Sequence, residues 1–530
     1  MITATDIVSG PVRGPGIGMA FPGATRQWDA GRFRLGQIGV VAIPLIATLL
    51  RIASPPTSAA AYVVVAIWAL TGRRQAVVSL FLCWLFNMAN HAFCGPPLMA
   101  AILRYVVILC AALSVFARGS TARSTTKARS LIWTTLSILV VIIIHCFLVS
   151  PMLDISLLKA VVFSVAFMTA LCGWAWMSPA ERHVTAQTVF GGLVLVICCS
   201  LPMAFMSAGY MRRGNLFCGV LSHSQEFGMV AGVVATFLAC QCLTQRPLSW
   251  WRGVVLLIAL AEVFHSKARI GMLAFVVGMV AAFAYQIASN AMTSSRLNPR
   301  IVAGRIVAAV VLFGILLVPF GDQIGKFAAD FINKGNAKGG EDLSLIEAGM
   351  ASRGGLIAIM SDNIGKHPVD GIGFGIASDP SLFGAVVRDG IFGLPIMATV
   401  EKGVMPLMVI EELGIPIAVL VFLWMGALGI CATRGGMVPV AVFASAMASN
   451  IAEATFFSPG GAGLLIIVLV CWAVTEPAGG AWKQNLRMRQ AAMARSAPNS
   501  APLSPLAPLP QLQALPAPRS LPTEPIGGRA

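Results

Sequence analysis

The stretch VFHSKARIGM (263–272) places an imidazole and two positive charges between two apolar runs. His265, Lys267 and Arg269 are its polar groups that could do chemistry. An imidazole donates or accepts a proton near neutral pH, and a guanidinium binds phosphate through paired, charge-assisted hydrogen bonds. If the flanking runs cross a membrane, these side chains meet at its surface. The stretch therefore predicts a turn that binds an anion, and a lipid-borne phosphate would lie at this depth.

Further residues of the same kinds recur between apolar runs. Arg212 and Arg213 stand in SAGYMRRGNLFCGVLSHSQE, where His223 follows them. In segment 320–402, Arg353 lies one turn before an apolar stripe that recurs at helical spacing. The motif KHPVDGIGFG (366–375) ends that predicted helix, and its alternate glycines allow close approach of the backbone to a ligand. The candidate residues of this segment and its end are His367, Gly373, Gly375, Glu401 and Lys402.

Composition indicates what positions these residues. The 530 residues are 57% hydrophobic and 11% charged, whereas about a quarter of a soluble domain is charged. Apolar runs recur in blocks of helical length and do not alternate as barrel strands would. We therefore predict an all-α, polytopic membrane protein with twelve to fourteen transmembrane helices and one large periplasmic loop.

Fourteen candidate spans give both termini the same side. They are 38–52, 58–71, 76–92, 97–117, 130–149, 156–177, 188–208, 226–244, 252–264, 270–288, 302–319, 403–428, 436–454 and 461–476. With a cytoplasmic N-terminus, the inner segments hold most of the Lys and Arg residues, which fits the positive-inside rule. The predicted organisation is an N-terminal arm (1–37), a bundle (38–319), the periplasmic loop (320–402), C-terminal helices (403–476) and a Pro/Ala-rich disordered cytoplasmic tail (477–530).

The predicted topology makes the four cations of positions 212, 213, 267 and 269 exceptions to the positive-inside rule. One explanation is that they extend to lipid headgroups, and the other is an outward-facing anion site. Glu262 is a candidate partner of Lys267 or Arg269. Arg104 and Lys159 are candidate partners of Glu226, Glu262, Glu411, Glu412 or Glu453, acids that are costly at membrane depth unless they face protein or water.

Several classes of site are not expected. The cysteines show no spacing typical of zinc or iron–sulfur ligands, and no nucleic-acid-binding motif or phosphate-binding loop is present. The net charge of +16 is explained by cytoplasmic segments that face anionic lipid. We expect no metal, no cofactor and no nucleic-acid partner. Cys94 and Cys218 fall in segments predicted to be outside, and a disulfide between them is left open.

Four segments resemble the bacterial O-antigen ligase and Wzy-type polysaccharide polymerase superfamily. They are RRGNLFCGVLSHSQEFG (212–228), HSKARIGMLAF (265–275), ASRGGLIAIMSDNIGKHPVDGIGFG (351–375) and EKGVMPLMVIEELGIPIAVLVF (401–422). The resemblance implies a glycosyltransferase of the inner membrane that acts at the periplasmic face. Its donor would be a glycan on undecaprenyl diphosphate. Its acceptor would be a second lipid-linked glycan in a polymerase, or lipid A core in a ligase.

The resemblance also implies roles for individual residues. Arg213, Arg269 and Arg353 match recurrent arginines of the family, which would bind the diphosphate, and Arg212 and Lys267 match more loosely. In the ligases, a histidine stands a few residues before the Glu-x-Gly motif that matches the predicted span 403–428. This chain has Glu401 and Lys402 there and no histidine, which favours a polymerase. Glu401 is the first candidate for the base and His223 the second, with Arg269 stabilising the leaving diphosphate.

The predicted partners are the lipid-linked oligosaccharide, the acceptor glycan, membrane lipid, and further proteins of polysaccharide export or chain-length control. The alternatives are a ligase and a flippase or transporter of the same lipid-linked glycans. A secondary carrier would show inverted repeats and charges at mid-membrane, and no clear repeat is seen.

Overall fold

The computed structural model describes residues 30–95, 99–119, 126–211, 216–244, 249–292, 345–379, 381, 387–388, 395–397, 402–451 and 453–476. Helices dominate this part of the chain. They are α1 (Ala30–Ala53), α2 (Pro55–Ala69), α3 (Arg73–Met88), α4 (Ala100–Ala117), α5 (Thr126–Val149), α6 (Leu153–Trp176), α7 (Pro179–Ser200), α8 (Ser224–Thr244), α9 (Trp250–His265), α10 (Arg269–Met292), α13 (Leu345–Lys366), α14 (Met405–Thr433), α15 (Met437–Ala448) and α16 (Gly463–Thr475). Two short strands, β1 (Val387–Arg388) and β2 (Pro395–Met397), pair antiparallel.

The all-α membrane architecture is confirmed at this level. Among the described residues, six helical segments are long and apolar enough to cross a membrane, and five shorter apolar helices accompany them. Each predicted span corresponds to one helix, except 302–319, which lies outside the described residues together with 1–29 and 477–530. Apolar side chains such as Leu113, Leu148 and Leu423 are exposed on the bundle surface, as lipid-facing residues would be.

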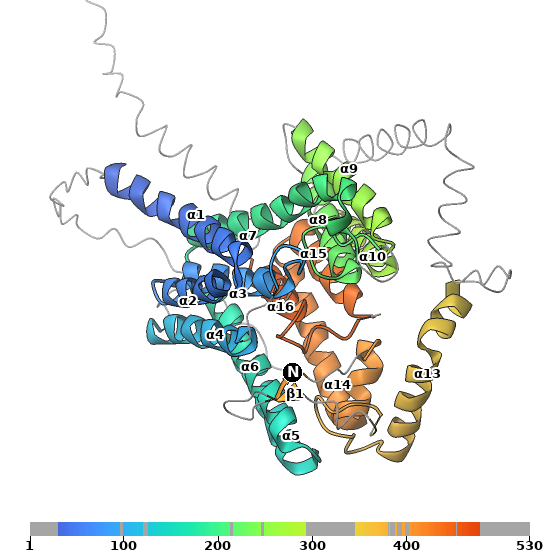
Figure 1. Cartoon of the computed structure of the whole chain (residues 1–530). Helices are drawn as coiled ribbons and strands as arrows, with labels where there is room; N and C mark the ends of the chain where they lie inside the picture. The colour runs from blue at the N-terminus through green and yellow to red at the C-terminus, as the bar shows by residue number, and fades with distance from the viewer. Residues whose placement is uncertain are drawn as a thin grey trace, which may run out of the picture.

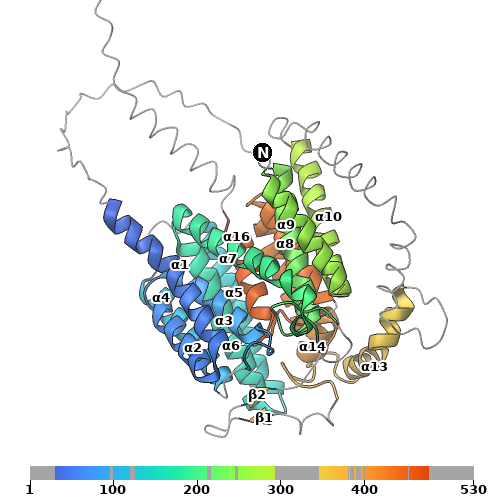
Figure 2. The same ribbon diagram turned by 45° about the horizontal axis from the view of Figure 1, so that its top comes forward.

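The helices form one bundle around α16 (Figures 1 and 2). Helix α16 contacts α3, α6, α14 and α15, and its residues from Gly463 to Val474 are buried. On one side α1, α2, α3 and α4 pack together, and on the other α8, α9, α10 and α15 do so. An apolar helix buried on all sides belongs to the centre of such a bundle.

Five glutamates and five arginines identify the two opposite ends of the bundle. One end, here called the carboxylate end, carries Glu226, Glu262, Glu411, Glu412 and Glu453. Residues far apart in sequence meet there. Arg104 donates to Gly460 O at 2.8 Å, and Ala454 N donates to Lys402 O at 3.1 Å. The opposite end, here called the arginine end, carries Arg73, Arg74, Arg118, Arg182 and Arg434. The loops predicted to be outside all meet at the carboxylate end, as far as they are described.

Helix α13 begins at Leu345 and ends at Lys366, as the capping pattern and Pro368 predict. It stands at the edge of the bundle and contacts α14 (Figure 1). Met360, on the predicted apolar stripe, is fully buried. Asn363, in the last turn of α13, donates to Glu411, so the chain that follows, 367–379, begins at the carboxylate end.

Candidate functional site: a broken helix and its charge network

Helix α14 is broken at Gly414. This residue has φ 71° and ψ 161°, and Pro416 follows it two positions later. A glycine tolerates this backbone conformation, and a proline in the helix interior removes a hydrogen bond and its ring clashes with the preceding turn. The predicted continuous span over 403–428 is therefore interrupted. Gly-Ile-Pro within an apolar run is the signal that indicates the break.

The chain after α13 satisfies the backbone groups that the break exposes. Ile372 N donates to Glu411 O at 2.9 Å and Gly373 N to Glu412 O at 3.1 Å, and Ile415 N donates to Pro368 O at 2.8 Å. Non-helical backbone at membrane depth is tolerated only where protein or water satisfies it. The segment 367–379 therefore completes α14 and is anchored by it.

The three glycines of GIGFG allow this close contact. Gly371, Gly373 and Gly375 have φ of 69°, 103° and 80°. A Cβ on Gly371 would lie 2.6 Å from Gly414 N, and one on Gly375 would lie 2.5 Å from Lys159 Cδ. A Cβ on Gly373 would lie 3.0 Å from the Cα of Ser150. The expected close backbone approach is thus present, and what it approaches is the protein itself.

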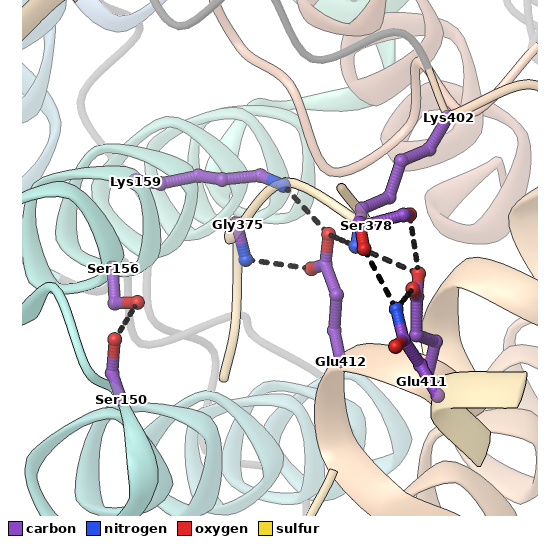
Figure 3. A network of polar contacts seen from close by, with 9 residues as sticks. Ser150, Ser156, Lys159, Gly375, Ser378, Lys402, Glu411 and Glu412 are labelled. Atoms are coloured by element: carbon purple, nitrogen blue, oxygen red, sulfur yellow. Dashed lines mark hydrogen bonds and ion pairs between the residues drawn. The ribbon is translucent and has the colours of Figure 1, made fainter. Parts of the chain in front are cut away.

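Two lysines and two glutamates form a buried network at the break (Figure 3). Lys402 Nζ lies 2.9 Å from Glu411 Oε2 and 3.1 Å from Glu412 Oε1, and Lys159 Nζ lies 3.5 Å from Glu412 Oε1. The exposed fractions of the side chains are 0% for Glu411, 1% for Glu412, 3% for Lys402 and 21% for Lys159. The pairing of Lys159 with a membrane acid confirms one of the predicted alternatives.

Neutral donors complete this network. Glu411 accepts from Asn363 Nδ2 at 2.7 Å and Ser378 Oγ at 2.9 Å, and Glu412 accepts from Gly375 N at 2.8 Å. Lys159 Nζ also lies 4.7 Å from the centre of the Phe374 ring. Each carboxylate oxygen has a donor and the charges sum to zero. Such a network holds α6, α13, α14 and the segment 367–379 in one arrangement, and none of its carboxylates is left to act as a base.

The turn 265–269, which carries Lys267 and Arg269, packs on the loop that precedes α8. His265 Nε2 lies 2.8 Å from the hydroxyl of Tyr210, which itself donates to Ala204 O. The histidine is therefore the donor. Lys267 has φ 52°, a conformation unusual for a residue with a side chain. Arg269 is half-buried as the first residue of α10.

Glycines bring α10 against α8 behind this turn. A Cβ on Gly271 would lie 2.2 Å from Gly228 O, and one on Gly232 would lie 2.2 Å from Gly271 O. Small residues at such positions let membrane helices approach closely. This contact fixes the start of α10, and with it the backbone of Arg269, relative to the start of α8, which follows His223.

Two imidazoles lie near each other at the same end. His223 is exposed immediately before α8. Burial, followed by the charges of Arg51 and His223, lowers the pKa of His91. Arg51 is itself buried, donating to Phe86 O at 3.0 Å and to Cys94 O at 3.1 Å. A neutral imidazole can accept a proton, so His91 retains a capacity that the glutamate network lacks.

The segment Ser449–Ala462 connects the two parts of this end. Its first turn contacts α10, Ala454 binds Lys402 through the backbone, and a Cβ on Gly461 would lie 3.8 Å from Glu226 Oε1. Asn450, fully buried, accepts from Phe456 N at 2.7 Å and from Thr455. The segment begins with a short 3-10 helix (Ser449–Ile451) that contacts both α10 and α14.

The remaining predicted residues have varied places. Arg212, Arg213 and Glu401 lie outside the described residues, although Met211 N donates to Leu216 O at 2.9 Å on either side of the two arginines. Arg353 lies within α13. His367 is exposed, with Nδ1 3.7 Å from Asp370 Oδ2.

Two of the open pairings are not formed. Neither carboxylate oxygen of Glu262 meets a hydrogen-bond partner among the described residues, so it is not bonded to Lys267 or Arg269. Cys94 and Cys218 are both free and buried. Lys159, Asn363 and Ser378 were not among the predicted site residues, because their role depends on the break in α14.

No group of three or more His, Cys, Asp or Glu side chains among the described residues is arranged to hold a metal ion. Comparison with known proteins leaves the family open: no family model matches the chain, and a search of curated proteins finds no match to it.

Proposed function

We propose that this protein is a membrane polymerase of polysaccharide repeat units. It transfers a glycan from undecaprenyl diphosphate to a lipid-linked acceptor glycan. The observation that carries the proposal is the meeting of three motif segments at one end of an apolar helix bundle. The His223 segment, the turn with Lys267 and Arg269, and the 367–379 segment with the α14 break all lie at the carboxylate end, opposite the arginine end.

The positive-inside rule supports the orientation. We infer a cytoplasmic arginine end from the arginines gathered there, and with it a periplasmic carboxylate end in a bacterial inner membrane. These arginines are Arg73, Arg74, Arg118, Arg182 and Arg434. A polyprenyl diphosphate has its anion at headgroup depth and its chain in the bilayer. In the proposed orientation, Lys267 in the turn before α10 and Arg269 at its first residue lie at the depth of this anion.

The proposed reaction needs little more than cations and a proton acceptor. An acceptor hydroxyl oxygen attacks the anomeric carbon, the bond from that carbon to the diphosphate oxygen breaks, and the electron pair leaves with the diphosphate. Negative charge on the leaving group is stabilised by Arg269, with Arg212, Arg213, Lys267 and Arg353 as further donors. The hydroxyl proton passes to Glu401 or to the exposed imidazole of His223.

The broken helix favours a second candidate, a flippase or transporter of the same lipid-linked glycans. Discontinuous helices with charged groups at the break are typical of secondary transporters. Against it stands the closed network itself, since Lys159 and Lys402 neutralise both carboxylates at the break. A transported ion would have to displace these lysines.

The decisive experiment is incubation of the purified protein with diphosphate-linked repeat units in lipid. A ladder of longer lipid-linked glycans supports the polymerase. Transfer to added lipid A core without a ladder would identify a ligase, and movement of intact donor across vesicles without transfer would identify a flippase.

Arg269 gives the sharpest test by mutation. We expect Arg269→Ala to lose at least about 100-fold in ladder formation, the scale on which one preorganised transition-state donor acts. Arg129→Ala, at an exposed residue at the start of α5, is the matched control and should retain activity. An unchanged ladder from Arg269→Ala, with the protein expressed at its normal level, would contradict the proposed site.

A further inference from the structure

A cavity of about 410 Å³ opens at the arginine end, away from the site described above. Its lining includes Arg73 and Arg74 at the start of α3, Arg118 after α4 and Glu181 at the start of α7. The four charged side chains sum to a net charge of +2. A cavity with this balance is suited to an anion.

Two of the arginines build its walls. Arg73 donates to Arg118 O at 2.8 Å and to Trp176 O at 3.4 Å. Arg118 donates to Leu70 O at 2.7 Å and to Ser114 Oγ at 2.6 Å. These contacts tie together the ends of α2, α4 and α6 and hold both guanidinium groups in place.

Arg74 is the arginine that these contacts leave available. No hydrogen bond from its guanidinium is found among the described residues, and its Nε is buried without a partner. Glu181 contributes the opposing charge, but its Oε2 accepts from both the backbone N and the hydroxyl of Ser178 in a capping box. A buried guanidinium donor without an acceptor is costly, and an anion in the cavity would satisfy it.

Apolar side chains continue from this cavity along the bundle surface. Ile67 and Leu70 of α2 are 62% and 42% exposed, and Leu113 and Phe116 of α4 are 63% and 43% exposed. Helices α2 and α4 are in contact, and Arg118 bridges them through Leu70 O. A ligand with a phosphate and an acyl chain would match both surfaces, whereas a soluble phosphate would use only the first.

We propose that this cavity binds the phosphate of an anionic phospholipid, with an acyl chain lying on the exposed residues of α2 and α4. Basic pockets between membrane helices on the cytoplasmic side are suited to such headgroups. Arg74 supplies charge-assisted hydrogen bonds to the phosphate oxygens, and Arg73 and Arg118 position the surrounding carbonyls and charge. The proposal does not depend on the polymerase reaction.

Native mass spectrometry of the purified full-length protein tests this, with phosphatidylglycerol titrated against phosphatidylcholine. We expect phosphatidylglycerol to be retained selectively and Arg74→Gln to weaken its binding about tenfold or more, as loss of a charged hydrogen bond predicts. Arg434 lies at the same end but outside the cavity, so the Arg434→Gln protein should bind phosphatidylglycerol as the unmodified protein does. Equal losses from Arg74→Gln and Arg434→Gln, or no loss from Arg74→Gln, would overturn the proposal.

Binding of inorganic phosphate and a second variant show whether the ligand is a lipid or a soluble anion. Leu113→Gln alters only the exposed apolar face, so it should weaken phosphatidylglycerol binding and leave the folded state intact by thermal melting. If inorganic phosphate binds as tightly as phosphatidylglycerol and Leu113→Gln changes neither, the ligand is a soluble phosphate and the lipid assignment is wrong.

Discussion

Replacing Lys402 by methionine tests whether the buried network holds the α14 break together. The substitution keeps most of the side-chain volume and removes the contacts of 2.9 and 3.1 Å to Glu411 and Glu412. Lys159, at 3.5 Å, then has to neutralise two carboxylates that are 0% and 1% exposed. One uncompensated buried charge costs about 3–5 kcal/mol, so we expect Lys402→Met to lower the free energy of unfolding by this amount.

The double variant distinguishes charge from packing. Lys402→Met with Glu411→Gln restores neutrality, and replacing a buried ion pair by neutral groups of similar volume is often nearly neutral. We therefore expect the double variant to be at least about 2 kcal/mol more stable than the sum of the two single losses predicts, a coupling within the range for direct contacts. Reversible unfolding in mixed micelles, followed by tryptophan fluorescence, measures all four proteins.

Lys366→Met is the matched control, because Lys366 pairs with Asp362 at 2.5 Å but the two side chains are 65% and 61% exposed. An exposed pair of this kind contributes at most about 1 kcal/mol. If Lys402→Met costs no more than this control, or if the single losses simply add, the network does not stabilise the break and the reasoning is refuted.

Three further predictions concern backbone, sidedness and pH. Gly414→Ala should cost at least about 1–2 kcal/mol, the penalty for a left-handed residue with a Cβ, whereas Gly426→Ala in the same helix, with open space around it, should be neutral or stabilising in the same unfolding assay. Single cysteines introduced at Lys366 and Arg129 should react with impermeant maleimide from opposite sides of intact cells and inverted vesicles, and labelling from the same side would contradict the topology. Because the pKa of His91 is lowered in the fold, protonation of this imidazole disfavours the folded state. The free energy of unfolding should therefore fall as the pH drops below about 6.5, and it should fall less in His91→Gln. Equal slopes of stability against pH in the two proteins would contradict this.

Hydropathy alone was enough to predict the helices. Every predicted span in the described part of the chain overlaps one helix, because a spanning helix must satisfy its backbone internally and present apolar side chains to lipid. The bounds were less accurate: α1 begins eight residues before the predicted 38, and α7 begins nine residues before the predicted 188. The start and end of α13 also followed from local signals, a capping pattern before Leu345 and Pro368 after Lys366. These features depend on residues close together in sequence.

The site depended on residues far apart in sequence, so it was predicted only in part. Lys159 lies about 250 positions before Glu412 and joins it only once α14 breaks at Gly414. The glycines of GIGFG predicted a close backbone approach. The φ preference of glycine is the same, however, whether the neighbour is a ligand or another segment of the protein. What Gly375 approaches, the stem of Lys159, required the three-dimensional structure.

The closed network restricts where a diphosphate could bind. Lys402 was predicted as a glycan or loop residue, but its charge is balanced by Glu411 and Glu412, so it adds no net attraction for an anion. In the proposed polymerase, the positive charge for the diphosphate comes instead from Lys267, in the turn before α10, and from Arg269, its first residue. Gly271 packs this start of α10 against α8. We therefore expect mutations at Lys402 to affect stability first and, in the proposed polymerase, mutations at Arg269 to affect transfer first.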